Sequence, residues 1–327
     1  MIAISQEKLK SASIKHFKYF GEKVLKKLNG CIKNQESIGE EKDFYEFLKD
    51  KYKDILIGKP ESLASLIENI KREFPAINLK IANSDNDLCN KISGVFNYDN
   101  FVSNYNGWGA YAYAKELGID VCPYCNRQYI VTYSSSDGRC RCELDHFFNK
   151  AKYPYLALSM YNLIPSCKTC NSSFKGDKSF SLKTHVHPFV EGFGDEYIFT
   201  INFKDSNGKD NLDFIQNPAV FDIKFKSKTG IDSILTEKAK CNVKIFKLEE
   251  LYCFHKETII ELMEKNIIYS ESMINDLYNQ YAGTLFQSRD EVLRLIIGNY
   301  CTDKDLGKRP LAKCMKDIAD ELGLLKR

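Results

Sequence analysis

The feature that most restricts the fold of this chain is two pairs of cysteines, Cys122-Pro-Tyr-Cys125 and Cys167-Lys-Thr-Cys170. Two residues between the cysteines of a pair allow a tight turn to direct both thiolates at one ion, and two such turns complete a tetrahedral site. We therefore predict that these four cysteines bind one zinc ion. Because four thiolates leave no coordination position for water, the zinc is expected to be structural.

Two other interpretations of the cysteines stay open. They could be unrelated buried thiols, or the two pairs could act as redox dithiols. The amino terminus lacks a basic region followed by an apolar stretch, and no apolar run approaches the roughly 18 residues of a membrane span. The expectation is a cytoplasmic protein, where twelve cysteines favour metal binding over a disulfide framework.

The segment between the two pairs is too long for a simple zinc ribbon, which leaves about 15 to 20 residues there. It contains Glu143-Leu-Asp-His-Phe147 and Tyr161-Asn-Leu-Ile-Pro165, and the second pair continues as Cys170-Asn-Ser-Ser-Phe-Lys-Gly176. This order of motifs resembles the zinc-braced HNH endonucleases over about residues 119–188. The resemblance implies a ββα-metal core that hydrolyses phosphodiester bonds.

The residues of these motifs suit that chemistry. An imidazole with a pKa near 6.5 can accept a proton at neutral pH, so His146 is predicted to be the general base that activates water. The resemblance implies that Asp145 and Asn171 bind one Mg²⁺ and that Asn162 orients the backbone by a hydrogen bond. Lys175 lies four residues after Asn171, on the same face if a helix begins there, and is a candidate contact to a substrate phosphate.

One residue departs from the commonest HNH pattern, because Asn171 stands where many members have a third histidine. An amide oxygen is a hard ligand, which favours Mg²⁺, with Mn²⁺ as a possible substitute, over Zn²⁺ or Ni²⁺. We therefore expect weaker metal binding at this site than in the histidine form.

Shorter elements outside the core resemble, more distantly, the PtuB-like nuclease subunits of bacterial anti-phage systems of the Septu and retron-associated kinds. They are Cys122-Pro-Tyr-Cys-Asn-Arg127, His187-Pro-Phe189 and Arg309-Pro-Leu-Ala-Lys313. This resemblance implies a P-loop ATPase partner, PtuA-like, in a complex that includes a retron in some systems. The chain itself has no Gly-x-x-x-x-Gly-Lys-Ser/Thr loop, so nucleotide-driven control would have to come from such a partner.

Hydrophobic periodicity predicts the remaining architecture. Residues 1–118 are expected to be helical, for example over Glu61–Phe74, and residues 119–190 to form the nuclease core with a hairpin around the turn at 134–138. Residues 191–327 are expected to form a small antiparallel sheet, from strands at 197–203 and 220–225, followed by helices that dock a partner. The predicted fold class is thus α+β, with mainly helical regions on both sides of the core.

The net charge of +3 gives no overall electrostatic case for nucleic acid, but residues 138–184 carry eight basic residues against Glu143, Asp145 and Asp177. Such a patch favours a polyanion, with DNA as the default substrate and RNA as an alternative. Lysines also surround the apolar stripe of a helix near residues 14–28, and we interpret them as a solvated face: Lys15, Lys18, Lys23, Lys26 and Lys27.

A second functional hypothesis is a zinc-structured nucleic-acid-binding or scaffold module without catalysis. His185 and His187 are spaced to share one side of a strand, and their roles stay open between structure and substrate contact.

Overall fold

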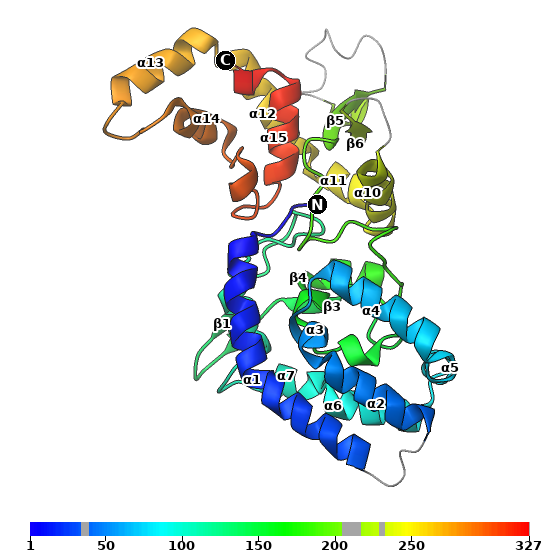
Figure 1. Cartoon of the computed structure of the whole chain (residues 1–327). Coiled ribbons are helices and arrows are strands. Elements are labelled where there is room, and N and C mark those ends of the chain that lie inside the picture. The colour runs from blue at the N-terminus through cyan, green and yellow to red at the C-terminus, as the bar shows by residue number, and fades with distance from the viewer. Residues whose placement is uncertain (34–38, 205–216, 229–232, 327) are drawn as a thin grey trace. The chain divides into compact units, whose positions relative to one another are not determined.

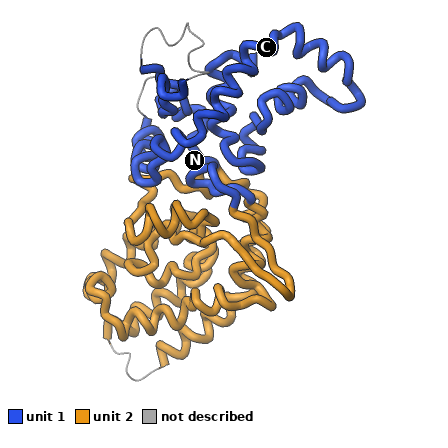
Figure 2. Tube along the Cα trace, turned by 180° about the vertical axis from the view of Figure 1, so that it is seen from behind, with its two compact units in different colours: residues 1–2, 120–129, 192–327 blue, residues 3–119, 130–191 orange. Residues whose placement is uncertain are grey.

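The computed structural model describes residues 1–33, 39–204, 217–228 and 233–326. Two compact units make up the chain, and Figure 2 colours them separately. Unit 2 contains residues 3–119 and 130–191, and unit 1 contains residues 1–2, 120–129 and 192–327. The three regions predicted from the sequence, 1–118, 119–190 and 191–327, stay a prediction, because a division of the chain into compact units does not test them.

Unit 2 is mainly helical, with two short hairpins (Figure 1). Helix α1 packs against α2, α3 and α8, so that one long helix organises the others. The elements are α1 (Gln6–Lys33), α2 (Glu40–Asp50), α3 (Tyr52–Ile57), α4 (Pro60–Glu73), α5 (Pro75–Ala82), α6 (Asn86–Val95), α7 (Tyr98–Ser103), α8 (Ala110–Leu117), β1 (Tyr133–Ser134), β2 (Arg139–Cys140), β3 (Glu143–His146), η1 (Pro154–Leu156), η2 (Met160–Asn162), β4 (Leu163–Ser166) and η3 (Thr169–Lys175).

Helix α4 shows how the sequence sets these elements. Its first residue is Pro60, whose fixed φ suits the first helical turn, and its end precedes Pro75. Leu63, Leu66 and Ile70 are buried at helical spacing, as the apolar pattern predicted. The predicted hairpin around 134–138 is confirmed, although β1 and β2 are shorter than the runs that suggested it.

Unit 1 contains the second small sheet and the later helices. Its elements are β5 (Tyr197–Phe203), η5 (Pro218–Val220), β6 (Phe221–Ser227), α10 (Ile234–Ile245), α11 (Leu248–Tyr252), η6 (Cys253–His255), α12 (Lys256–Ile268), α13 (Glu271–Tyr281), α14 (Arg289–Ile297), η7 (Asp303–Asp305), α15 (Ala312–Glu321) and η8 (Leu324–Lys326). Strands β5 and β6 pair antiparallel with Phe199 opposite Phe225. The predictions of an α+β chain and of a small antiparallel sheet here are confirmed. None of the described helices combines the length and apolar character needed to cross a bilayer.

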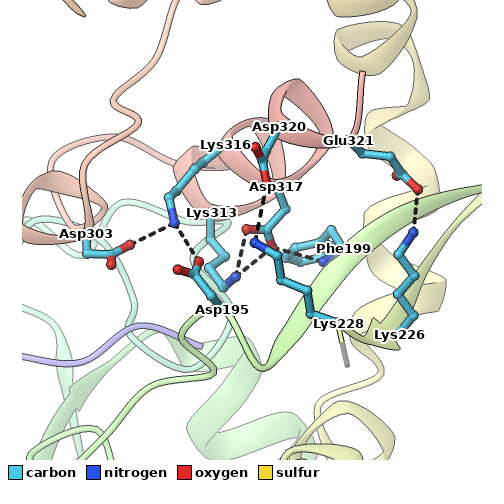
Figure 3. A network of polar contacts seen from close by, with 10 residues as sticks. All are labelled: Asp195, Phe199, Lys226, Lys228, Asp303, Lys313, Lys316, Asp317, Asp320 and Glu321. Atoms are coloured by element: carbon cyan, nitrogen blue, oxygen red, sulfur yellow. Dashed lines mark hydrogen bonds and ion pairs between the residues drawn. The ribbon is translucent and has the colours of Figure 1, made fainter. Parts of the chain in front are cut away.

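Helix α15 covers the open edge of β5 with carboxylates (Figure 3). Asp317 Oδ2 accepts a hydrogen bond from Phe199 N at 2.9 Å. Glu321 Oε2 accepts one from Ile201 N at 3.1 Å. The spacing explains the match, because residues two apart on a strand direct their N–H groups to one edge and residues four apart on a helix share a face. Two N–H groups of an edge strand are thereby satisfied by side chains.

Asp317 is itself paired inside the unit. Lys313 Nζ lies 2.6 Å from Asp317 Oδ2, and each side chain is 2% exposed (Figure 3). Burial raises the pKa of Asp317 and lowers that of Lys313, while each charge opposes the shift of the other. Removal of one partner would therefore leave a buried charge without compensation.

We predict that Lys313→Met lowers the free energy of unfolding of unit 1 by about 3 kcal/mol, the cost of leaving one member of a buried pair uncompensated. Chemical denaturation followed by circular dichroism measures the change. Lys240→Met is the control, because its ion pair with Glu237 is solvent-exposed and contributes less than about 1 kcal/mol. Equal effects of the two substitutions would contradict this account.

A buried histidine ties α1 to the rest of unit 2. His16 Nε2 donates to Leu158 O at 2.8 Å, and His16 Nδ1 accepts from Trp108 Nε1 at 3.2 Å. Both ring nitrogens are thus satisfied in the neutral form, and protonation would set two N–H donors against each other. Burial lowers the pKa of His16 from 6.5 to about 4.

We predict that unit 2 loses stability as the pH falls from about 6.5 toward 4. In this window the unfolded chain binds a proton at His16 that the folded chain does not, which costs about 1.4 kcal/mol per pH unit. His16→Gln keeps one donor and one acceptor but cannot titrate. The stability of this variant should therefore fall less steeply with decreasing pH, by about 1.4 kcal/mol per pH unit. Urea unfolding at several pH values measures how the free energy of unfolding depends on pH. Identical slopes for the variant and the wild type would contradict the assignment to His16.

Candidate active site

A short hairpin carries the two residues predicted to do chemistry. Strand β3 pairs antiparallel with β4, with Asp145 opposite Ile164 and His146 opposite Leu163. The helical turn η3 follows β4 and contacts β3. The local order is therefore strand, strand, helix, with Asp145 and His146 at the end of the first strand.

Asn162 fastens the long connection between the two strands. Its Oδ1 accepts from Phe148 N at 2.7 Å, and its Nδ2 donates to Phe148 O at 3.0 Å and to Leu156 O at 3.1 Å. The side chain has no exposed surface. A buried amide with all three bonds made is costly to replace, so Asn162 holds the backbone that directly follows His146.

The imidazole of His146 has a fixed orientation. Its Nε2 lies 2.9 Å from Ala157 O, which can only accept, so the proton is on Nε2 and Nδ1 carries a lone pair. The ring of Tyr98 meets it edge-on at 4.6 Å between centroids. Burial lowers the pKa of His146 to about 3, a shift that Lys150 and Lys175 reinforce, so the ring is neutral at pH 7.

The carboxylate of Asp145 is ion-paired. Lys175 Nζ lies 2.8 Å from Asp145 Oδ1 and donates to His146 O at 2.7 Å. Each of the two side chains is 2% exposed. Lys175, predicted to contact a substrate phosphate, therefore joins η3 to β3 and neutralises the charge of Asp145 in this structure.

Asn171 lies beside a second carboxylate. Its Nδ2 donates to Glu143 Oε2 at 2.9 Å, and the Ser172 hydroxyl donates to the same oxygen at 2.7 Å. Both donors come from η3 and the acceptor from β3, so these bonds and the lysine contact hold the helical turn against the strand.

These side chains meet at one cleft of about 250 Å³. Asp145, His146, Asn171 and Lys175 line it together, whereas Asn162 lies outside its lining and binds the backbone beside it. Among the other residues that line the cleft are Tyr98, Asn149 and Lys150, none of which the sequence analysis named as a site residue. Tyr98 comes from α7, far along the chain, and no local motif indicates it.

The four predicted zinc ligands gather in space. The sulfurs of Cys122, Cys125, Cys167 and Cys170 lie within 4.8 Å of one another, and all four residues are buried. Two backbone N–H groups point at sulfurs, from Arg127 to Cys125 Sγ and from Cys170 to Cys167 Sγ, each at 3.4 Å. Four converging thiols in this arrangement fit a structural metal such as zinc.

The two histidines left open by the sequence pack on aromatic rings. The imidazole of His185 stacks on Phe180 with centroids 3.8 Å apart, and that of His187 lies 4.2 Å from the Phe147 ring. The expectation that they share one side of a strand is wrong, because residues 185–187 form no strand. Pro188 follows directly and cannot donate to a ladder hydrogen bond.

Comparison with known proteins finds that part of the chain is similar to one curated protein. The chain is 29% identical over 147 residues to the Septu protein PtuB of Bacillus thuringiensis, a match that covers 42% of this chain. The chain spans about half the length of that curated relative, 53%. No family model matches the chain, and no solved structure matches it.

We predict that the purified protein contains about one zinc ion per chain, as four thiolates around one ion require. Cys167→Ser should lower the zinc content severalfold and lower the thermal unfolding midpoint, because metal binding contributes directly to folding. Cys241→Ser, at an exposed cysteine outside the cluster, is the control and should keep the zinc. Elemental analysis after exhaustive dialysis measures the metal, and a zinc-free native protein would favour buried thiols or dithiols.

Proposed function

We propose that this chain is a metal-dependent nuclease of the HNH type that hydrolyses phosphodiester bonds of nucleic acid. The observation that carries the proposal is the orientation of His146, whose Nε2 is bonded to Ala157 O while the ring lines the same cleft as Asp145 and Asn171. A neutral imidazole held in one tautomer beside hard oxygen donors is what water activation at a phosphate requires.

His146 would act as general base through Nδ1. It takes a proton from water, the resulting hydroxide attacks phosphorus, and the bond from phosphorus to the departing oxygen breaks, with a proton from solvent completing the product alcohol. The low pKa makes the isolated imidazole a weak base. Negative charge that a bound phosphate keeps beside the ring would raise that pKa and strengthen the base.

The oxygen donors of the cleft fit a hard cation. Asp145 and Asn171 line it together, and Glu143 is bonded to Asn171. When bound, Mg²⁺, or Mn²⁺ in its place, would neutralise charge on the phosphate oxygens and on the leaving group. Asp145 is ion-paired with Lys175, so the Lys175 ammonium would compete with the cation for this carboxylate. When cation and phosphate are both bound, the ammonium would turn toward the phosphate.

The similarity to a Septu protein supports a second layer of the proposal. We propose a role as the nuclease of an anti-phage defence complex with a PtuA-like P-loop ATPase partner, in a retron assembly in some hosts. The basic stretch at 138–184 supports a nucleic acid substrate, with DNA as the default and RNA as the alternative. Expression together with the neighbouring genes, followed by affinity purification, tests the partner; a chain that purifies without an ATPase would argue against it.

The rival function is a zinc-structured nucleic-acid-binding or scaffold module without catalysis. The buried ion pair of Lys175 with Asp145 favours this rival, because a carboxylate that is paired with an ammonium is less available to bind a metal ion. Binding without cutting would distinguish this rival from the nuclease.

We predict that wild-type protein cleaves plasmid DNA or RNA in Mg²⁺ and not in EDTA, and that His146→Ala slows cleavage at least about 100-fold, the usual contribution of a general base. Asp145→Asn should do the same by weakening metal binding. Gel assays with supercoiled plasmid and with a structured RNA measure both rates.

His255→Gln, a substitution in unit 1, serves as the control and should leave the rate unchanged. Equal rates for His146→Ala and wild type would refute the base assignment. Binding without cutting by every variant, wild type included, would favour the scaffold.

A further inference from the structure

A series of recesses leads away from the candidate active site within unit 2. The cleft at Asp145 and His146 shares Tyr98 and Lys150 with a second recess of about 410 Å³ along α6 and α7. The second shares Asn97 with a third of about 470 Å³ against α1. Because neighbouring recesses share lining residues, the three follow one another within unit 2, and we refer to them together as the path. Figure 1 shows the helices α1, α6 and α7 that border it.

The path is lined by cations. Lys150 borders the second recess, and Lys23, Lys26 and Lys27 border the third, whereas the one acidic residue that lines either of them in the described part of the chain is Asp99. None of the four ammonium groups forms an ion pair with a carboxylate of any described residue. Three have other contacts: Lys23 over the Tyr19 ring at 3.3 Å, Lys27 with Gly94 O at 2.6 Å, and Lys150 over the Tyr98 ring at 5.0 Å.

These contacts preorganise the cations without neutralising them. A carbonyl oxygen or an aromatic face holds an ammonium in place and leaves its net charge to act on a ligand. Lys15, on the same helix, differs because its ammonium is paired with Glu116. The helix face that the sequence analysis interpreted as solvated therefore has one part, at Lys23, Lys26 and Lys27, that borders a recess.

We infer that this path binds a single strand of nucleic acid on one side of the bond that is cut, with the lysines of α1 holding phosphates several nucleotides away. The inference rests on the proposed nuclease function. Successive recesses suit a flexible strand, which can place its nucleotides one after another and stack a base near Tyr98. A duplex keeps its bases paired and stacked and would pass over recesses of this size.

The salt dependence of binding tests the inference. For a single strand, the slope of log affinity against log salt concentration changes by about 0.7 for each phosphate contact. The variant Lys23→Gln/Lys26→Gln/Lys27→Gln should therefore bind more weakly and with a slope smaller by about 2. Fluorescence anisotropy of the full-length protein with a labelled single strand of about 16 nucleotides, without added divalent cation, measures the slope.

Lys10→Gln/Lys18→Gln/Lys80→Gln is the matched control, because it removes the same charge from exposed positions that border none of these recesses. It should leave the slope within about 0.5 of wild type, less than one phosphate contact. Thermal unfolding of both variants verifies their fold. Equal slopes for the two triple variants would overturn the path, and a change confined to a duplex probe of the same sequence would overturn the single-strand assignment.

The cleavage assay separates this inference from the function on which it rests. A wild-type protein that cuts while the first triple variant keeps its salt slope refutes the path and leaves the nuclease in place. A protein that cuts neither DNA nor RNA but shows the predicted loss of slope supports a binding path and refutes the nuclease. Absence of binding to either probe by wild type overturns the path, and absence of cutting by the same protein overturns the nuclease.

Discussion

The hydrogen bonds of one buried amide hold the geometry on which the site depends. Asn162 bonds to both backbone groups of Phe148 and to Leu156 O, and thereby closes the long connection between β3 and β4. Since Phe148 lies two residues after His146, the same bonds limit the positions open to the imidazole. Ala157 O, in the same connection, then selects its tautomer. The hydrogen bonds of one fully satisfied side chain thus fix the backbone between the two strands, and that backbone fixes the orientation of the His146 ring.

The ion pair between Lys175 and Asp145 gives the cleft a second property. Two opposite charges at 2.8 Å, both nearly removed from water, stabilise each other only while they remain together. The cleft therefore contains its own cation, and under the proposed function this ammonium would compete with a metal ion for the carboxylate. The neutral His146, the paired Asp145 and the amide of Asn171 make up a cleft whose charge depends on what binds there.

Sequence reasoning predicted what local patterns determine. The cysteine spacing predicted the convergence of four sulfurs, and helical periodicity predicted α4. Sequence reasoning did not predict the contacts that depend on how segments distant in the sequence pack together. Tyr98 meets His146 only because α7 packs near the hairpin, and the ion pair of Lys175 depends on the contact of η3 with β3. His185 and His187 pack on rings that no spacing rule indicates. The lysines of α1 looked like a solvated face because periodicity describes one helix and not its neighbours.

The central claim is that Asp145 and Asn171 are placed to hold a hard divalent cation beside His146. Electron paramagnetic resonance of Mn²⁺ titrated into the zinc-loaded protein tests it most directly, because free Mn²⁺ gives a signal that disappears on binding. We expect about one bound Mn²⁺ per chain. Asp145→Asn should lose that binding, and Asp177→Asn, at a residue of the same cleft that is not a proposed ligand, should keep it. Mn²⁺ binding that Asp145→Asn leaves unchanged would contradict the proposed metal site.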